Sequence, residues 1–80
     1  AFLVDVRTPE EFESGHVHAS VNIPLDQVAE RLDEFDGKNH IIVFCRSGAR
    51  SGMAKAILAQ NGINHVTNGG TWEDIKQHID

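Results

Sequence analysis

IIVFCRSGARSG, residues 41–52, joins a continuous apolar run to a basic loop that is rich in glycine and serine. The run at residues 41–44 consists of β-branched and aromatic residues, as expected for a parallel strand that is covered on both faces. Cys45, the single cysteine of the chain, comes first after this strand, and an apolar helical stripe begins a few residues later. The stretch therefore predicts a strand, a tight loop that carries a thiol, and a helix.

The alternation of strand and helix patterns continues on both sides of this stretch. Strands alternating with helices pair in parallel through right-handed crossovers, which predicts an α/β fold with a sheet between two layers of helices. Active sites in such folds lie beyond the carboxyl ends of the strands, where Cys45 is predicted to lie. The predicted strands are residues 2–6, 21–23, 41–44 and 64–67. The predicted helices are residues 8–14 and 25–35, and a third that runs from the cysteine loop to about residue 61. A turn is predicted at residues 68–70, and a last helix begins at residue 71.

Local signals support individual helices. Thr8 and Glu11 have the spacing of a capping box, which predicts a helix start. Apolar residues recur at three- and four-residue spacing in residues 25–35, which predicts an amphipathic helix. In the last helix, we expect Ile75 and Ile79 to face inward.

Length and charge limit the classes of protein that the chain can represent. Its 80 residues, 40% of them hydrophobic, suffice for one modest core, which predicts a single domain over residues 1–80. Twelve acidic and seven basic residues give a formal charge of −5, which would repel a phosphate backbone and argues against a nucleic-acid partner. We expect a monomer whose partners are small molecules or other proteins.

Targeting signals and cysteine content set further limits. No apolar run approaches the roughly 20 residues that a membrane span needs, and residues 1–9 lack the features of a signal peptide. We therefore expect a soluble chain without membrane contact, and leave cytoplasm and periplasm as alternatives. One cysteine excludes an internal disulfide and a multi-cysteine metal site, and the histidines lack zinc-site spacing. We expect no metal, and we interpret His16 as structural.

The loop after Cys45 has the chemistry of an anion cradle. A tight turn into a helix directs backbone N–H groups inward, and the helix dipole adds partial positive charge there. Arg46 and Arg50 add full charges, and Gly48 lets the backbone turn without a Cβ clash. A free cysteine is usually a small buried hydrophobe, but these polar neighbours favour a reactive thiol that is shifted toward thiolate.

Several motifs in a fixed order resemble the rhodanese family. They are DVR at residues 5–7, FESGHV at 12–17, NIP at 22–24 and CRSGARS at 45–51. The resemblance covers nearly the whole chain and is greatest for single-domain thiosulfate sulfurtransferases of the phage-shock-protein-E-like type. It implies a three-layer rhodanese-like fold, with a small parallel sheet of four to five strands flanked by helices.

The resemblance also implies a reaction and a site. Cys45 would attack the outer sulfur of thiosulfate, release sulfite, hold a persulfide, and pass the sulfur to cyanide, a small thiol or a thioredoxin-like acceptor. No cofactor beyond this covalent intermediate is implied. Asp5 and Arg7 would lie beside the cradle and brace it, with an exposed ion pair as the alternative. The residues implied in substrate binding are Arg46, Ser47, Gly48, Ala49, Arg50 and Ser51.

Two other functions remain as alternatives. A cysteine phosphatase or arsenate reductase also places a thiolate at a helix N-terminus, but phosphatase loops have five residues between cysteine and arginine, and this loop has four. An inactive rhodanese module that only binds partners is the other alternative. The chain also departs from the family pattern, because Ala19 and Ser20 stand where many relatives have Gly-Ala, and almost nothing precedes Phe2. The latter indicates a minimal type or a trimmed chain.

Overall fold

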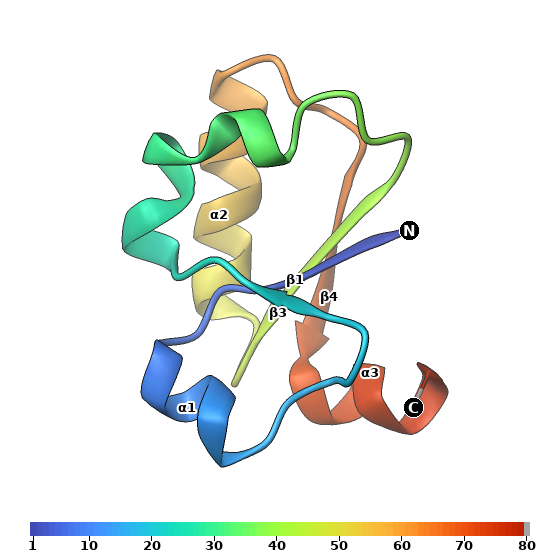
Figure 1. Cartoon of the computed structure of the whole chain (residues 1–80). Coiled ribbons are helices and arrows are strands. Elements are labelled where there is room, and N and C mark those ends of the chain that lie inside the picture. The colour runs from blue at the N-terminus through green and yellow to red at the C-terminus, as the bar shows by residue number, and fades with distance from the viewer. Residues whose placement is uncertain (80) are drawn as a thin grey trace.

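The computed structural model describes residues 1–79 and has a four-stranded, fully parallel sheet with strand order β2-β1-β3-β4 (Figure 1). The predicted α/β class is confirmed, with four strands. The strands are β1 (Phe2–Asp5), β2 (Val21–Asn22), β3 (Ile41–Cys45) and β4 (Val66–Thr71). The helices are α1 (Pro9–Ser14), α2 (Ala49–Gln60), α3 (Trp72–Ile79) and two 3-10 helices, η1 (Leu25–Glu30) and η2 (Leu32–Glu34).

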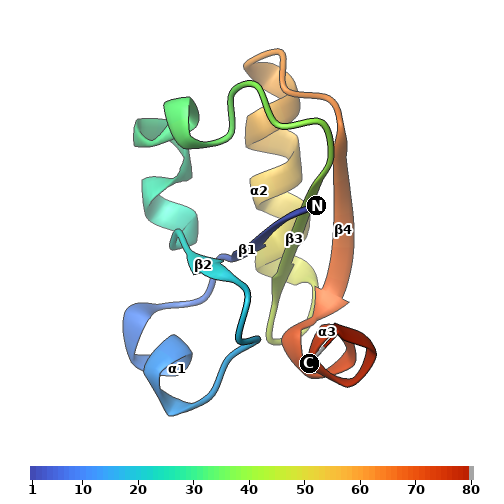
Figure 2. The same cartoon turned by 45° about the vertical axis from the view of Figure 1, so that its right-hand side comes forward.

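Helices cover both faces of the sheet, and alternate residues of β3 point to opposite faces. Val43 and Cys45 belong to the larger core cluster, which includes Leu58 of α2. Phe44, between them in sequence, belongs to a second cluster against which Ile75 of α3 packs. Figure 2 shows α2 on one side of the strands and α3 near the end of β4. The continuous apolar run of β3 is therefore explained by burial on both faces.

The predicted helix at residues 25–35 is wrong in type and continuity. The structure has two 3-10 helices here, separated at Arg31, whose φ of −120° breaks the helical path. Apolar residues lie three apart within each short helix, Leu25 and Val28 in η1, then Leu32 and Phe35 at η2. Residues three apart lie on the same side of a 3-10 helix, so this spacing is compatible with both helix types.

The predicted turn at residues 68–70 is also wrong, because these residues continue β4. Val43 pairs with Asn68 and Phe44 with Gly70, so Gly69 is an extra residue in the ladder, a β-bulge. A Cβ at Gly69 would lie 2.9 Å from side-chain atoms of Ile42 and Ile75, which explains glycine at this position. The bulge lets β4 pair with β3 as far as Cys45.

The helix termini agree with the capping signals, and one burial prediction fails. Thr8 and Glu11 form the predicted capping box of α1. Ile75 packs inward as predicted, but Ile79 is 50% exposed and does not face the core.

Ala19 and Ser20, where the chain departs from the family pattern, adopt an ordinary backbone conformation. The Ser20 amide donates a hydrogen bond to the Val17 carbonyl, and no non-glycine residue among 1–79 has a positive φ. None of the helices described within this range has the length and apolarity needed to cross a membrane.

Candidate active site

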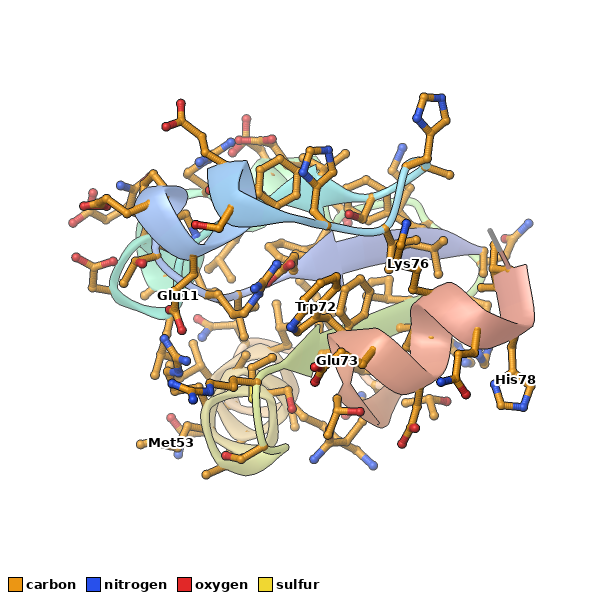
Figure 3. All side chains as sticks on the ribbon, turned by 90° about the horizontal axis from the view of Figure 1, so that it is seen from below. Glu11, Met53, Trp72, Glu73, Lys76 and His78 are labelled. Atoms are coloured by element: carbon orange, nitrogen blue, oxygen red, sulfur yellow. The ribbon has the colours of Figure 1, made fainter. Side chains whose placement is uncertain are left out.

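Cys45 was predicted to come first after the strand, but it is the last residue of β3, at the carboxyl end of the sheet. Its side chain is fully buried and faces the core cluster that includes α2. Figure 3 views the molecule from this end, with Trp72 and Glu73 of α3 near the centre and Glu11 of α1 toward the left. The loop from Cys45 to the start of α2 therefore turns at the edge where active sites of parallel sheets lie.

Gly48 shapes the loop and contributes a hydrogen-bond donor to the sulfur. Its φ of +95° lies in the left-handed region, and a Cβ at this position would lie 3.5 Å from the Cα of Gly70. In this conformation the Gly48 amide donates to the Cys45 sulfur over 3.0 Å. Among residues 1–79, no side chain caps the N-terminus of α2, which starts at Ala49. The amides and the dipole of this terminus are thus available to an anion at the sulfur.

These contacts change the ionisation of the thiol. Burial alone would raise the pKa of Cys45. The Ser51 hydroxyl and the backbone amides of Ser51, Ser47 and Gly48 outweigh this effect and hold the pKa of Cys45 below its usual value. At a given pH, Cys45 is therefore more often a thiolate, the nucleophilic form, than a cysteine without these contacts.

Sequence reasoning missed Asn68, which lies on β4 and contacts this loop. Its side-chain oxygen accepts from the Ser51 hydroxyl over 2.7 Å, and its side-chain nitrogen donates to the Gly48 carbonyl over 3.2 Å. Ser51 is fully buried, and its oxygen lies 3.5 Å from the Cys45 sulfur. Parallel pairing of β3 with a strand that includes Asn68 would have placed this residue beside the loop. The sequence predicted a turn at residues 68–70 instead, so Asn68 was not assigned to the strand.

Arg50 is on the first turn of α2, but its charge is already paired. Its guanidinium donates two hydrogen bonds to the Glu11 carboxylate, over 2.7 and 3.0 Å. Hydrogen bonding from Arg50, with further help from Thr8, lowers the pKa of Glu11 to about 2. This pair links α1 to α2 and commits two N–H donors of the Arg50 guanidinium to Glu11.

Arg46 is the unpaired cation of the loop. It is exposed and forms no ion pair within residues 1–79. It lines a hollow of about 240 Å³ together with side chains from α1 and α3. The other lining residues are Arg7, Glu11, Ser14, Trp72 and Glu73. Ser47 and Ala49, also predicted to bind substrate, are exposed in or beside the same loop.

Asp5 and Arg7 form a buried pair with side chains 0% and 4% exposed, so the exposed alternative is wrong. The Arg7 side chain donates to both Asp5 carboxylate oxygens, with a shortest distance of 2.7 Å, and to the Gly15 carbonyl. It also stacks on Trp72, with its guanidinium carbon 4.4 Å from the ring centroid. The pair braces α1 and α3 and makes no hydrogen bond to the cysteine loop among the described residues.

The structure brings most of the predicted site residues to one end of the sheet. His16, interpreted as structural, has Nδ1 2.7 Å from the Phe12 carbonyl oxygen and its ring stacked on Phe12. Within residues 1–79, no group of three or more His, Cys, Asp or Glu side chains could hold a metal ion. The arrangement therefore offers one buried thiol, several amide donors around it, and one unpaired arginine.

Known proteins resemble the chain in sequence and in structure. It is 42% identical over 74 residues to thiosulfate sulfurtransferase PspE of Escherichia coli (strain K12), covering 90% of this chain and 71% of the relative. It is 38% identical to a sulfurtransferase of Allochromatium vinosum, covering 82% of this chain and 62% of the relative. A solved rhodanese with anions from E. coli superposes with a TM-score of 0.83 at 39% identity, covering 91% of this chain and 88% of the other.

The family assignment rests on nearly the whole sequence. The model of the rhodanese-like domain matches residues 1–77, which include both the buried Asp5–Arg7 pair and the cysteine loop. The named relatives support an enzyme of sulfur transfer in general. With the parallel sheet and the thiol at its carboxyl edge, these matches establish that the chain belongs to the rhodanese family.

Proposed function

We propose that this chain moves the outer sulfur of thiosulfate to a thiophilic acceptor through a persulfide on Cys45. The observation that carries the proposal is the set of donors at the buried Cys45 sulfur, above all the Gly48 amide at 3.0 Å. A thiolate held by such donors can attack a sulfur atom, and the same donors can stabilise the negative charge of a persulfide. A relative solved as a rhodanese with anions is consistent with an anionic substrate.

The proposed reaction has two displacements. In the first, the Cys45 thiolate attacks the outer sulfur of thiosulfate, a new S–S bond forms, and sulfite leaves with the electron pair of the broken S–S bond. In the second, cyanide or an acceptor thiolate attacks the outer sulfur of the persulfide and the Cys45 thiolate leaves. The products are thiocyanate or an acceptor persulfide, and the cycle needs no metal or cofactor.

Arg46 and the loop amides have separate roles in this proposal. Arg46 is exposed and unpaired within the described chain, so it would attract the thiosulfate dianion to the loop. The amides of Ser47, Gly48 and Ser51 act at the sulfur itself, where they favour the thiolate. Arg50 would contribute mainly by fixing the first turn of α2, because its guanidinium is held by Glu11.

The phosphatase alternative finds less support. Four residues separate Cys45 from Arg50, one fewer than in a phosphatase loop. The Arg50 guanidinium, which would have to contact a phosphoryl group, makes two hydrogen bonds to Glu11 instead. The loop thus fits a sulfur atom better than a tetrahedral phosphate.

The test is formation of thiocyanate from thiosulfate and cyanide. The wild-type protein should form thiocyanate, and Cys45→Ser should form none. Thr67→Ala is a suitable control, because Thr67 is an exposed β4 residue whose side-chain oxygen lies 3.3 Å from Nε2 of His40, away from the loop. Transfer by Cys45→Ser, or wild-type hydrolysis of an aryl phosphate faster than sulfur transfer, would contradict the proposal.

A further inference from the structure

The Ser51 hydroxyl has one proton and three neighbours that compete for it. Its oxygen lies 2.7 Å from the Asn68 side-chain oxygen, 3.1 Å from the Gly48 carbonyl oxygen and 3.5 Å from the Cys45 sulfur. A hydroxyl donates one hydrogen bond but can accept two. The shortest of the three contacts is the one to Asn68.

The orientation of the Asn68 amide is fixed by two backbone groups. The Gly70 amide donates to its oxygen over 3.0 Å, and its nitrogen donates to the Gly48 carbonyl over 3.2 Å. Turning the amide over would place two donors together at Gly70 and two acceptors together at Gly48. The Asn68 oxygen is therefore an acceptor that faces Ser51.

We propose that Asn68 is a positioning residue that holds the Ser51 hydroxyl proton, so that the Ser51 oxygen faces the Cys45 thiol as an acceptor. When Cys45 ionises, Ser51 can donate to the sulfur only by giving up its bond to Asn68. Asn68 therefore opposes ionisation and limits how far the Ser51 hydroxyl lowers the pKa of Cys45. The proposal deepens the proposed function and rests on it for the role of the Cys45 thiolate.

The charged groups at the cysteine end of the sheet come from several elements and are separate from this contact. They are Arg46 in the loop, Arg50 of α2 with Glu11 of α1, the Asp5–Arg7 pair after β1, and Glu73 of α3. Strand β4 contributes no titratable side chain between Val66 and Thr71. Replacement of Asn68 by a neutral residue therefore leaves every charge near Cys45 in place.

The experiment is the pH dependence of Cys45 alkylation by iodoacetamide, measured on the free protein without thiosulfate. Asn68→Ala should lower the pKa of Cys45 by about half a unit or more, because it frees the Ser51 proton for the thiolate. Asn68→Asp should raise that pKa, because a carboxylate holds the proton more strongly and adds a negative charge. The matched control Thr67→Ala, on the neighbouring β4 position, should leave it unchanged.

A second pair of variants tests whether Asn68 acts through Ser51. Without the hydroxyl, Ser51→Ala and the double variant Ser51→Ala with Asn68→Ala should have the same Cys45 pKa. General loosening of the loop would instead shift Asn68→Ala and Asn68→Asp in the same direction.

The proposal is overturned if Asn68→Ala leaves the Cys45 pKa unchanged or raises it. It is equally overturned if the Asn68→Ala shift persists when Ser51 is alanine. These results are independent of the proposed function, because alkylation needs no thiosulfate. Absence of thiocyanate formation would refute the function and leave the alkylation results standing.

Discussion

The connections that follow β1 and β3 leave the same edge of the sheet as neighbours, yet they use their polar groups in opposite ways. After β1, Asp5 accepts from the backbone and side chain of Arg7, and Thr8 and Glu11 cap α1. After β3, no side chain of the described residues caps α2, and the Gly48 amide donates to the Cys45 sulfur. One connection satisfies its own donors, whereas the other offers them to a reactive atom.

Because of this difference, the connection after β1 serves mainly the stability of the fold and the connection after β3 serves mainly the chemistry of the thiol. Uncapped helix termini leave amides without partners, and capping normally stabilises a helix. The open terminus of α2 gives up that stabilisation and gains a site where negative charge is favoured. The connection after β1 compensates by fixing α1 and α3 around it, through Gly15 and Trp72. Substitutions in the two connections should therefore affect different quantities.

The largest effect on folding is expected in the connection after β1. Asp5→Asn leaves the buried Arg7 charge without its counterion, which should lower the free energy of unfolding by about 3–5 kcal/mol. Urea unfolding measures this change. The partly exposed Arg31–Glu34 pair provides the control, because Glu34→Gln should change the unfolding midpoint little. Equal losses in the free energy of unfolding for the two substitutions would contradict the larger contribution assigned to the buried Asp5–Arg7 pair.

In the connection after β3, Gly48→Ala should mainly reduce activity. The left-handed φ of Gly48 should make alanine cost about 1–2 kcal/mol of stability. Displacement of its amide from the sulfur should lower sulfur transfer about tenfold or more. Gly62→Ala is a matched control, since Gly62 has a φ of +82° and no atom of residues 1–79 lies within 4 Å of an added Cβ. It should lose similar stability and keep activity, and a parallel loss of activity would contradict the role of Gly48.

A smaller effect is expected from the charge that guides substrate to the loop. Arg46→Glu should raise the KM for thiosulfate about fivefold and weaken its salt dependence, because a repelling charge replaces an attracting one. Lys55→Glu makes the same charge change at an exposed position further along α2 and should have a much smaller effect. If both variants have the same KM for thiosulfate across a salt series, the effect of Arg46 comes from the net charge of the protein and not from its position in the loop.

The smallest effect concerns the ion pair that joins the two connections. Glu11 has a pKa of about 2 beside Arg50, below its value of 4.5 without these contacts. A lowered carboxylate pKa stabilises the fold above pH 4.5, and this stabilisation is lost as the pH falls toward about 2. Near neutral pH, the free energy of unfolding of the wild type should exceed that of Glu11→Gln by about 1 kcal/mol. Urea unfolding should show this gap narrowing below pH 4.5, whereas a constant gap would contradict the assignment.

The sequence predicted the sheet and the position of the thiol loop, because these depend on local patterns. The run at β3 and the capping box of α1 are each contained within a few neighbouring residues. The 3-10 helices were missed because apolar spacings of three and four residues satisfy either helix type. The strand at residues 68–70 was missed because Asn-Gly-Gly is typical of turns, and the bulge at Gly69 depends on contacts with Ile42 and Ile75.

Side-chain pairing in the site was harder to predict than its location. Arg50 was expected to present a free charge, but its partner Glu11 is 39 residues away in sequence. Asn68 contacts the loop because β4 continues to pair with β3 as far as Cys45, the last residue of β3. Such contacts follow from strand register and helix placement, which local spacing does not determine.

The central claim is that Cys45 accepts a sulfur atom, and intact-mass measurement after incubation with thiosulfate tests it most directly. The protein should gain the mass of one sulfur atom, the gain should map to the peptide that contains Cys45, and cyanide should remove it with release of thiocyanate. Cys45→Ser should gain nothing under the same conditions. An unchanged wild-type mass after excess thiosulfate, or a gain that persists in Cys45→Ser, would contradict the account.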